Sequence, residues 1–176
     1  MGSVIHRSRF SKEVKLKLGI FAVYFVAALV FFYFGFQPAT KPEDVYAEEA
    51  SQASAMLSLD NTAEPLPVKT IKKQGKELEV PEQIVGAYST HVNKTLLIGH
   101  SATAFSNLKD LRLGDEVTYN GKEYTITDIV EKQKQDISMK EILKAEETDT
   151  LVLMTCAGEP VNGTNDYTHR LIVTAK

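Results

Sequence analysis

Two apolar stretches decide the fold, Thr150-Leu-Val-Leu-Met-Thr-Cys156 and His169-Arg-Leu-Ile-Val-Thr-Ala175. Each is short and rich in β-branched residues, which predicts a strand. Paired antiparallel as a hairpin, they place Cys156 across from Arg170 at the open end, beneath the loop from Ala157 to Thr168. A thiol beside a fixed cation is partly converted to thiolate, its reactive form. The hairpin therefore predicts a reactive thiol at the end of a sheet.

Cys156 is the single cysteine of this 176-residue chain. One cysteine cannot form an internal disulfide, so it is a buried inert side chain, an intermolecular link or a free reactive thiol. Its place at a strand end, with a basic residue across the hairpin, favours the reactive thiol. A thiol redox function is disfavoured because the chain has no resolving cysteine.

The N-terminal region is of a different kind from the rest. Between Leu18 and Phe36 there is no charged residue, and nearly every position is aliphatic, aromatic or small. A helix of these 19 residues spans about 28 Å, enough for the hydrocarbon core of a bilayer. Residues 1–17 carry five basic groups and one acidic group. The positive-inside bias therefore predicts a cytoplasmic basic segment (1–17), a transmembrane anchor (18–36) in the cell membrane and an extracellular C-terminal domain.

A cleaved signal peptide is the alternative for this region. Its small-residue cleavage site would be Val45-Tyr46-Ala47. The apolar span is longer than a usual signal peptide has, and the candidate site lies well beyond it. These two features favour the retained anchor.

Charge and residue spacing exclude two classes of partner. The formal net charge is −3, but residues 1–17 sum to +4 and residues 18–176 to −7. A domain of that sign is a poor partner for nucleic acid, which needs a basic face. The chain has no C-x-x-C or H-x3-H spacing, and its clustered acids read as ordinary turn residues, so we expect no metal and no cofactor.

Residues 37–66 predict a flexible linker. Three prolines punctuate this stretch, a fourth follows directly at Pro67, and Ala, Glu, Ser and Gln fill the stretch. It has too few large apolar side chains to offset the entropy of ordering. A transient helix over Glu43–Leu59 would have no strong apolar face. From 67 to 176 the pattern changes to short apolar runs separated by turns, which we assign to one domain.

That domain is predicted to be mostly β, a barrel or closed sheet with one or two short helices. The expected strands are Leu78–Val80, Ile84–Tyr88, Thr95–Ile98, Glu116–Tyr119, Glu123–Val130, Leu151–Thr155 and Leu171–Ala175. Asn120-Gly121 between two of them predicts a type I′ hairpin turn. Phe105–Leu111 predicts a short helical turn, and the capping-box spacing at Ser138 predicts a helix to about Ala145.

The thiol needs an acid/base partner, for which there are four candidates: His6, His91, His100 and His169. His6 is excluded because it lies in the cytoplasmic segment. His91 lies in a polar turn, where a solvated side chain is usual. His169 precedes Arg170 on the same strand, so alternation points it to the opposite face. These exclusions leave His100.

His100 follows the apolar strand Thr95–Ile98 and Gly99, which permits a tight exit from the strand. If that strand runs parallel to the strand of Cys156, the two C-terminal ends meet on one rim of the barrel. His100 is then the best candidate to protonate a leaving amine. Arg170 is either an ordinary edge-strand charge or a hydrogen-bond donor to a developing oxyanion.

Several short stretches recur in this order in one known family. They are Leu97-Ile-Gly-His-Ser101, Phe105 with Leu108 and Leu111, Gly114-Asp115, Leu151-Val-Leu-Met-Thr-Cys156 and Arg170-Leu-Ile-Val173. From about Val80 to Ala175, the chain resembles the sortases. The ordered His, Thr-Cys and Arg set is specific as a set. An N-terminal anchor followed by a tether is also typical of that family.

The resemblance implies a membrane-anchored cysteine transpeptidase on an eight-stranded β-barrel. Its thiol would attack the Thr–Gly bond of an LPxTG-like signal on a surface protein or pilin. An amine, from a cell-wall precursor or a pilin lysine, would resolve the thioester. The implied site residues are, for catalysis, Cys156, His100 and Arg170 and, for substrate binding, Thr155, Ser101 and Ala157. The helix at Ser138–Ala145 would lie in the loop that receives the Leu-Pro part of the signal.

The alternative within the same resemblance is a catalytically inactive sortase-like domain that serves as a surface binding module. The complete set of His100, Cys156 and Arg170 argues against it. The turn Ser89–Lys94 lacks the acidic residues that bind calcium in some class A sortases, so calcium activation is not expected. The linker carries no aromatic lid motif, which favours an open site and leaves the subclass open.

Overall fold

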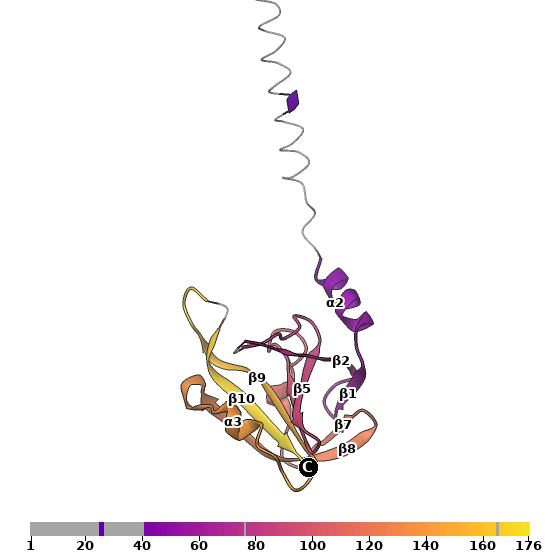
Figure 1. Cartoon of the computed structure of the whole chain (residues 1–176), viewed down its shortest axis with the longest axis vertical. Coiled ribbons are helices and arrows are strands. Elements are labelled where there is room, and N and C mark those ends of the chain that lie inside the picture. Colours follow the sequence, from indigo (N-terminus) through magenta and orange to yellow (C-terminus); the bar gives the residue numbers. More distant parts are fainter. Residues whose placement is uncertain (1–24, 27–40, 76, 165) are drawn as a thin grey trace, which may run out of the picture. The chain divides into compact units, whose positions relative to one another are not determined.

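The computed structural model describes residues 25–26, 41–75, 77–164 and 166–176 of the chain (Figure 1). The chain divides into two units, 1–40 and 41–176, and the β domain lies in the second. The predicted cytoplasmic segment (1–17) and transmembrane anchor (18–36) lie outside the described residues, apart from Phe25 and Val26. Of the helices in the described ranges, none is both long and apolar enough to cross a bilayer.

Eight of the described strands close into a barrel, which confirms the predicted mostly β fold (Figure 1). In barrel order they are β1 (Ala55–Leu59), β2 (Leu66–Thr70), β5 (Val85–His91), β6 (Lys94–Ile98), β9 (Thr150–Pro160), β10 (Tyr167–Ala175), β8 (Lys122–Gln133) and β7 (Glu116–Tyr119). Pairing of β7 with β1 closes the ring. The pairs β2–β5 and β6–β9 are parallel, and the others are antiparallel.

The remaining described elements are short. They are α2 (Pro42–Ser51), α3 (Met139–Ile142), the 3-10 turns η1 (Leu108–Asp110) and η2 (Lys134–Asp136), and a separate hairpin of β3 (Lys73–Gln74) and β4 (Glu77–Leu78). The strand predicted at Leu78–Val80 is therefore wrong as a barrel strand, because only its first residue pairs, and it pairs with β3.

Local turn and cap chemistry follows the sequence closely. Asn120 and Gly121 have φ of 51° and 79°, the two positive values that a type I′ turn between β7 and β8 requires. The side chain of Ser138 accepts a hydrogen bond from the backbone N–H of Glu141, as the capping-box spacing predicts. The helix that it caps, α3, ends at Ile142 instead of Ala145.

The linker predicted at 37–66 is wrong for its described part, 41–66. This part contains α2 and β1, and β1 completes the barrel, so the domain begins before the predicted residue 67. Leu57 and Leu59 are buried in the barrel core, although the short apolar run that holds them, AMLSL, is flanked on both sides by polar and small residues. Two alternating leucines suffice here, because β1 fills a gap between two existing strand edges and both of its sides form hydrogen bonds.

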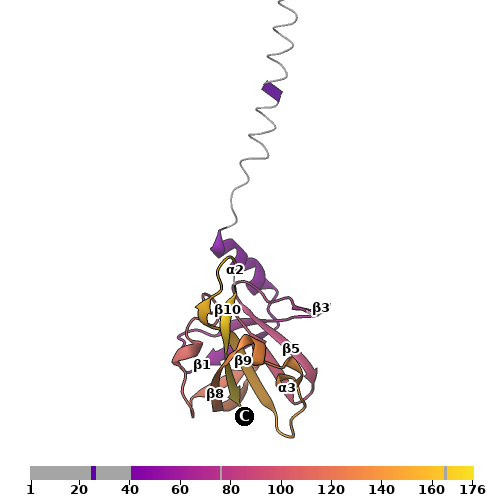
Figure 2. The ribbon, with the colours of Figure 1, turned by 90° about the vertical axis from the view of Figure 1, so that its left-hand side faces the viewer.

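Alternation along β9 gives the barrel wall two apolar faces. Leu151 and Leu153 point to the interior, where they belong to one core cluster with side chains of all seven remaining barrel strands. Val152 and Met154 point outward and form a second cluster with side chains of β6 and β10. Figures 1 and 2 show α3 on this outer side of the barrel, where its Met139 packs against the second cluster.

Candidate active site

Cys156 and Arg170 face each other across the β9–β10 hairpin, at the register that the sequence predicts. Each lies two residues from a member of the outer cluster, Met154 on β9 and Ile172 on β10. Alternation therefore places both side chains on the outside of the barrel wall. The expectation that the site lies on a barrel rim is therefore wrong: Cys156 and Arg170 lie in a groove on the outer wall of the barrel.

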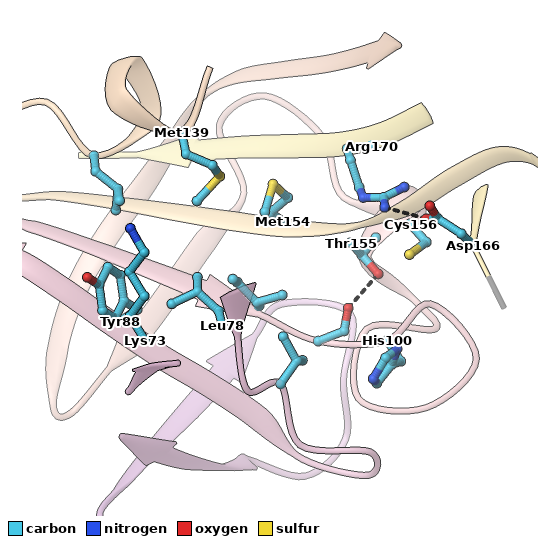
Figure 3. A pocket seen from close by; sticks show the side chains of 14 residues that line it. Lys73, Leu78, Tyr88, His100, Met139, Met154, Thr155, Cys156, Asp166 and Arg170 are labelled. Carbon is cyan, nitrogen blue, oxygen red and sulfur yellow. Dashed lines mark hydrogen bonds and ion pairs between the residues drawn. The ribbon is translucent and has the colours of Figure 1, made fainter. Parts of the chain in front are cut away.

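His100 reaches the same place from the other side of β9. The strands β6 and β9 run parallel and pair as far as Ile98 with Met154. His100 and Cys156 each lie two residues beyond this last pair, so they are level with each other. Figure 3 shows the sulfur of Cys156 between the ring of His100 and the guanidinium of Arg170. The three residues line one groove.

The exit of the chain from β6 is fixed by hydrogen bonds around Gly99. The N–H of Gly99 donates to the carbonyl oxygen of Met154 (3.3 Å), and its own carbonyl accepts from the buried hydroxyl of Thr155 (2.7 Å). The carbonyl oxygen of His100 then accepts from the N–H groups of Thr103 and Phe105. The backbone on both sides of His100 is thus fixed, which keeps this residue beside β9.

Gly99 has a second reason to be glycine. A Cβ atom at this position would lie 2.9 Å from Cδ2 of Phe105, closer than carbon atoms tolerate. The ring of Phe105 is fully buried in the barrel core and covers this part of the backbone. The apolar residue five positions after His100 therefore closes the barrel end beneath the histidine.

The guanidinium of Arg170 is held on several sides. Its Nη1 donates to the carbonyl oxygens of Tyr167 (3.0 Å) and His169 (2.8 Å), and its Nη2 donates to Oδ1 of Asp166 (2.6 Å). Its side chain is 15% exposed. Hydrogen bonds hold the pKa of the Asp166 carboxyl well below its usual range; the bond from Lys134 has the larger effect, and the bond from Arg170 adds to it. Asp166 therefore remains a carboxylate beside the arginine.

The groove has a volume of about 410 Å³ and runs along β9 (Figure 3). Cys156 lies at one end, while Tyr88 and Lys73 lie at the other. Between them the lining is largely apolar: Leu78, Val80, Ile98, Met139, Leu143 and Met154. A groove of this kind suits an extended peptide: its apolar side chains would lie along the lining, and the residue that follows them would reach the Cys156 thiol.

The three residues implied for substrate binding differ in their positions. Thr155 lines the groove, and its buried hydroxyl is bound to the carbonyl of Gly99. Ser101 and Ala157, both described, are not among the lining residues. Ala157 packs against the interior core instead, four residues from Leu153 and therefore on the same face of β9.

The other histidines of the domain lie away from the groove lining. His91 ends β5 and is exposed. His169 has its Nδ1 2.8 Å from the hydroxyl of Thr168 and lies against Gly158, where a Cβ would come within 2.3 Å of that nitrogen. Among the described residues there is no group of three or more His, Cys, Asp or Glu side chains arranged to hold a metal ion.

Asp166 and Lys73 line the groove but were not predicted from sequence. Asp166 precedes Arg170 by four residues but lies in the turn before β10, where strand alternation does not predict the direction of a side chain. The turn before β10 brings the two side chains together. Lys73 belongs to a short hairpin that the pattern of apolar residues does not mark. The sequence offers only a weak signal for them: each is a charged residue a few positions before an apolar stretch, Asp166 before Leu171–Val173 and Lys73 before Leu78.

Comparisons with known proteins agree with this fold and site. Residues 58–176 match the family described as the sortase domain. The pilus-related sortase C of Group B Streptococcus is 23% identical, with 71% of this chain and 66% of that chain covered and a TM-score of 0.53. Sortase C-1 from Actinomyces oris is 23% identical (79% and 81% covered, TM-score 0.51), and sortase A of Listeria monocytogenes is 14% identical (71% and 86% covered, TM-score 0.53).

A comparison with curated proteins gave no match. The structural similarities, at these identities, show a shared fold. The family match covers more than half of the chain and includes every strand of the barrel except most of β1. The chain therefore belongs to the sortase family.

Proposed function

We propose that this protein is a membrane-anchored cysteine transpeptidase, which cleaves an LPxTG-like sorting signal and transfers the acyl group to an amine. The observation that carries the proposal is the convergence of His100, Cys156 and Arg170 on one groove with an apolar lining. A thiol, an imidazole and a guanidinium are the nucleophile, the proton carrier and the anion stabiliser that acyl transfer needs.

In the first half-reaction the Cys156 thiolate attacks the threonine carbonyl carbon of the signal. The carbonyl oxygen becomes an oxyanion, to which Arg170 donates hydrogen bonds. Collapse of this intermediate breaks the Thr–Gly bond, and His100 gives its proton to the leaving glycine amine. The product is a thioester on Cys156. Arginine cannot serve as the base because it stays protonated in proteins.

In the second half-reaction an amine attacks the thioester carbonyl. His100, now neutral, accepts a proton from the attacking nitrogen, and Cys156 leaves as a thiolate. The acceptor is a cell-wall precursor or a pilin lysine. The leucine and proline of the signal would lie against Met139 and Leu143, at the α3 wall of the groove.

The partners are surface proteins or pilins with a C-terminal LPxTG-like signal. We place the barrel outside the cell, with the basic segment 1–17 in the cytoplasm and 18–36 in the membrane. The uncharged run of residues 18–36 supports the span, and the excess of basic residues in 1–17 supports this orientation. The anchor would keep the groove close to membrane-bound substrates and precursors.

The test is to incubate the purified chain with a panel of LPxTG-like peptides, with and without an amine such as triglycine, and to analyse the products by mass spectrometry. We expect cleavage after threonine, transfer to the amine and a thioester that hydroxylamine releases. Cys156→Ala is the matched control. If wild type and this variant both leave every peptide intact while the wild type still binds one, the inactive binding module replaces the transpeptidase.

A further inference from the structure

Three charged side chains form a continuous line beside the groove. The Asp166 carboxylate accepts from Nζ of Lys134 through Oδ2 and from Nη2 of Arg170 through Oδ1, the latter at 2.6 Å. Its Oδ1 also accepts from the backbone N–H of Tyr167 at 2.9 Å. The carboxylate is thus held between two cations and its own backbone, and it lines the groove with Arg170.

These contacts determine which protons Arg170 can offer to a substrate. A guanidinium has five N–H donors in a fixed plane. The bonds to Tyr167 and His169 use both protons of Nη1, and Asp166 takes one proton of Nη2. Among the described residues, these bonds leave two protons of Arg170 without a partner, the Nε proton and the second Nη2 proton, and both can be donated to an oxyanion. Without Asp166, only Nη1 would be tied, and the plane could turn about that end.

Lys134 has a separate part in the arrangement. A carboxylate beside Arg170 would, alone, cancel the positive charge that Arg170 brings next to Cys156. With Lys134 on its other oxygen, the three side chains sum to one positive charge. Lys134 comes from η2, which lies between β8 and α3, so this segment and β10, the strand of Arg170, are linked through the Asp166 carboxylate.

We propose that Asp166 is a positioning residue that sets the plane of the Arg170 guanidinium for the oxyanion, with Lys134 as the counter-cation that preserves positive charge beside Cys156. The proposal rests on the proposed transpeptidase function, because it assigns a role within that reaction. Asp166 itself does not touch the reacting atoms. It acts through Arg170.

The experiment compares the full-length wild type with Asp166→Asn, Asp166→Glu and Lys134→Gln. Asp149→Asn is the matched control, because Asp149 also accepts from a lysine, Lys122, at 2.5 Å, but does not line the groove. For each protein, kcat and KM for peptide cleavage and the rate of Cys156 alkylation by iodoacetamide at fixed pH are measured.

We expect Asp166→Asn to lower kcat at least tenfold, with KM within twofold and with alkylation as fast as in the wild type or faster, since a negative charge is lost. Asp166→Glu recovers part of the loss. Lys134→Gln slows alkylation, because a positive charge is lost. Asp149→Asn changes none of these rates. The proposal is overturned if Asp166→Asn keeps the wild-type kcat. It is also overturned if Asp166→Glu and Asp166→Asn lose kcat equally and Cys156 is alkylated more slowly in both.

Arginine side-chain NMR supplies a readout that does not need turnover. The chain has four arginines, and the signal of Arg170 is assigned by its loss in Arg170→Lys. We expect separate, slowly exchanging Nη signals for Arg170 in the wild type and averaged signals in Asp166→Asn. Averaged signals in both proteins overturn the positioning role. Fixed signals without any Cys156-dependent cleavage would instead contradict the transpeptidase function and leave the geometry of Arg170 established.

Discussion

At the scale of single residues, the chemistry depends on side chains that main-chain geometry brings together. Cys156 and Arg170 are cross-strand partners, so any sequence that forms this hairpin places them face to face. His100 joins them because β6 runs parallel to β9. Those three could be predicted, because strand alternation and pairing follow simple periods. Asp166 could not be, because the conformation of a turn decides which polar side chains meet there.

Arg170→Ala is expected to lower kcat/KM about 10²- to 10³-fold, the usual effect of removing a donor to an oxyanion. Arg170→Lys should rescue little, since an ammonium group cannot reproduce the planar fork held by two carbonyls and a carboxylate. The measurement is steady-state peptide cleavage, with circular dichroism to verify the fold. Full activity of Arg170→Ala would remove this residue from the site.

Gly99→Ala is expected to destabilise the barrel by about 1–3 kcal/mol, the usual range for overpacking. The new Cβ would lie 2.9 Å from the Phe105 ring, and the strain would fall on the chain that carries His100. The measurement is urea unfolding of Gly99→Ala, Phe105→Leu and the double variant.

The double variant is the control for this steric explanation. Phe105→Leu alone leaves space in the core, so the combined loss of unfolding free energy should be smaller than the sum of the single losses. Strict additivity would show that the two side chains do not compete for the same space, contrary to the structure.

At the scale of elements, β1 is the barrel strand that the sequence pattern does not reveal. Its five residues, AMLSL, contain two buried leucines, but the sequence on both sides is rich in Ala, Ser and charged residues, as in a linker. Tertiary context makes it a strand, because β2 and β7 both present open edges to it. The hairpins β7–β8 and β9–β10 were predictable because they carry their own turn signal or continuous apolar runs.

A fragment of residues 60–176 should therefore fail to fold stably, whereas 41–176 should unfold cooperatively. Loss of β1 opens the ring between β2 and β7 and exposes two strand edges, which also favours aggregation. Sedimentation velocity and thermal unfolding of both fragments measure this. Leu57→Ala in the longer fragment is a graded version, with an expected loss of about 2–5 kcal/mol. Equal stability of the two fragments would show that β1 is dispensable.

At the scale of the whole molecule, three carboxylates link the connecting loops to the barrel. Glu146 accepts from the buried Lys94 (3.1 Å) and from Lys176 (3.3 Å), and Asp149 and Asp166 hold other lysines. Hydrogen bonds from Lys94 and then from Lys176 lower the pKa of the Glu146 carboxyl. A carboxyl whose pKa is lower in the folded chain stabilises the fold above its unfolded pKa of about 4.3, and this contribution is lost as the pH falls.

Glu146→Gln should accordingly reduce stability at pH 7 by about 1 kcal/mol, a value for a partly exposed pair, and by less at pH 3. The two curves of unfolding free energy against pH should converge on the acid side. Urea unfolding at several pH values and low salt tests this, with Glu147→Gln as the neighbouring control. Curves that stay parallel down to pH 3 would mean that Glu146 keeps no ion pair in solution.

The double-sided packing of β9 separates two tasks within one strand. Leu151 and Leu153 seal the interior, while Met154 faces the groove in which Cys156 lies. A library randomised at Met154, Leu143 and Tyr88 would therefore vary the proposed peptide preference on a scaffold whose inward-facing residues are left intact. Laboratory evolution of such an enzyme could change what it recognises without first having to rebuild what keeps it folded.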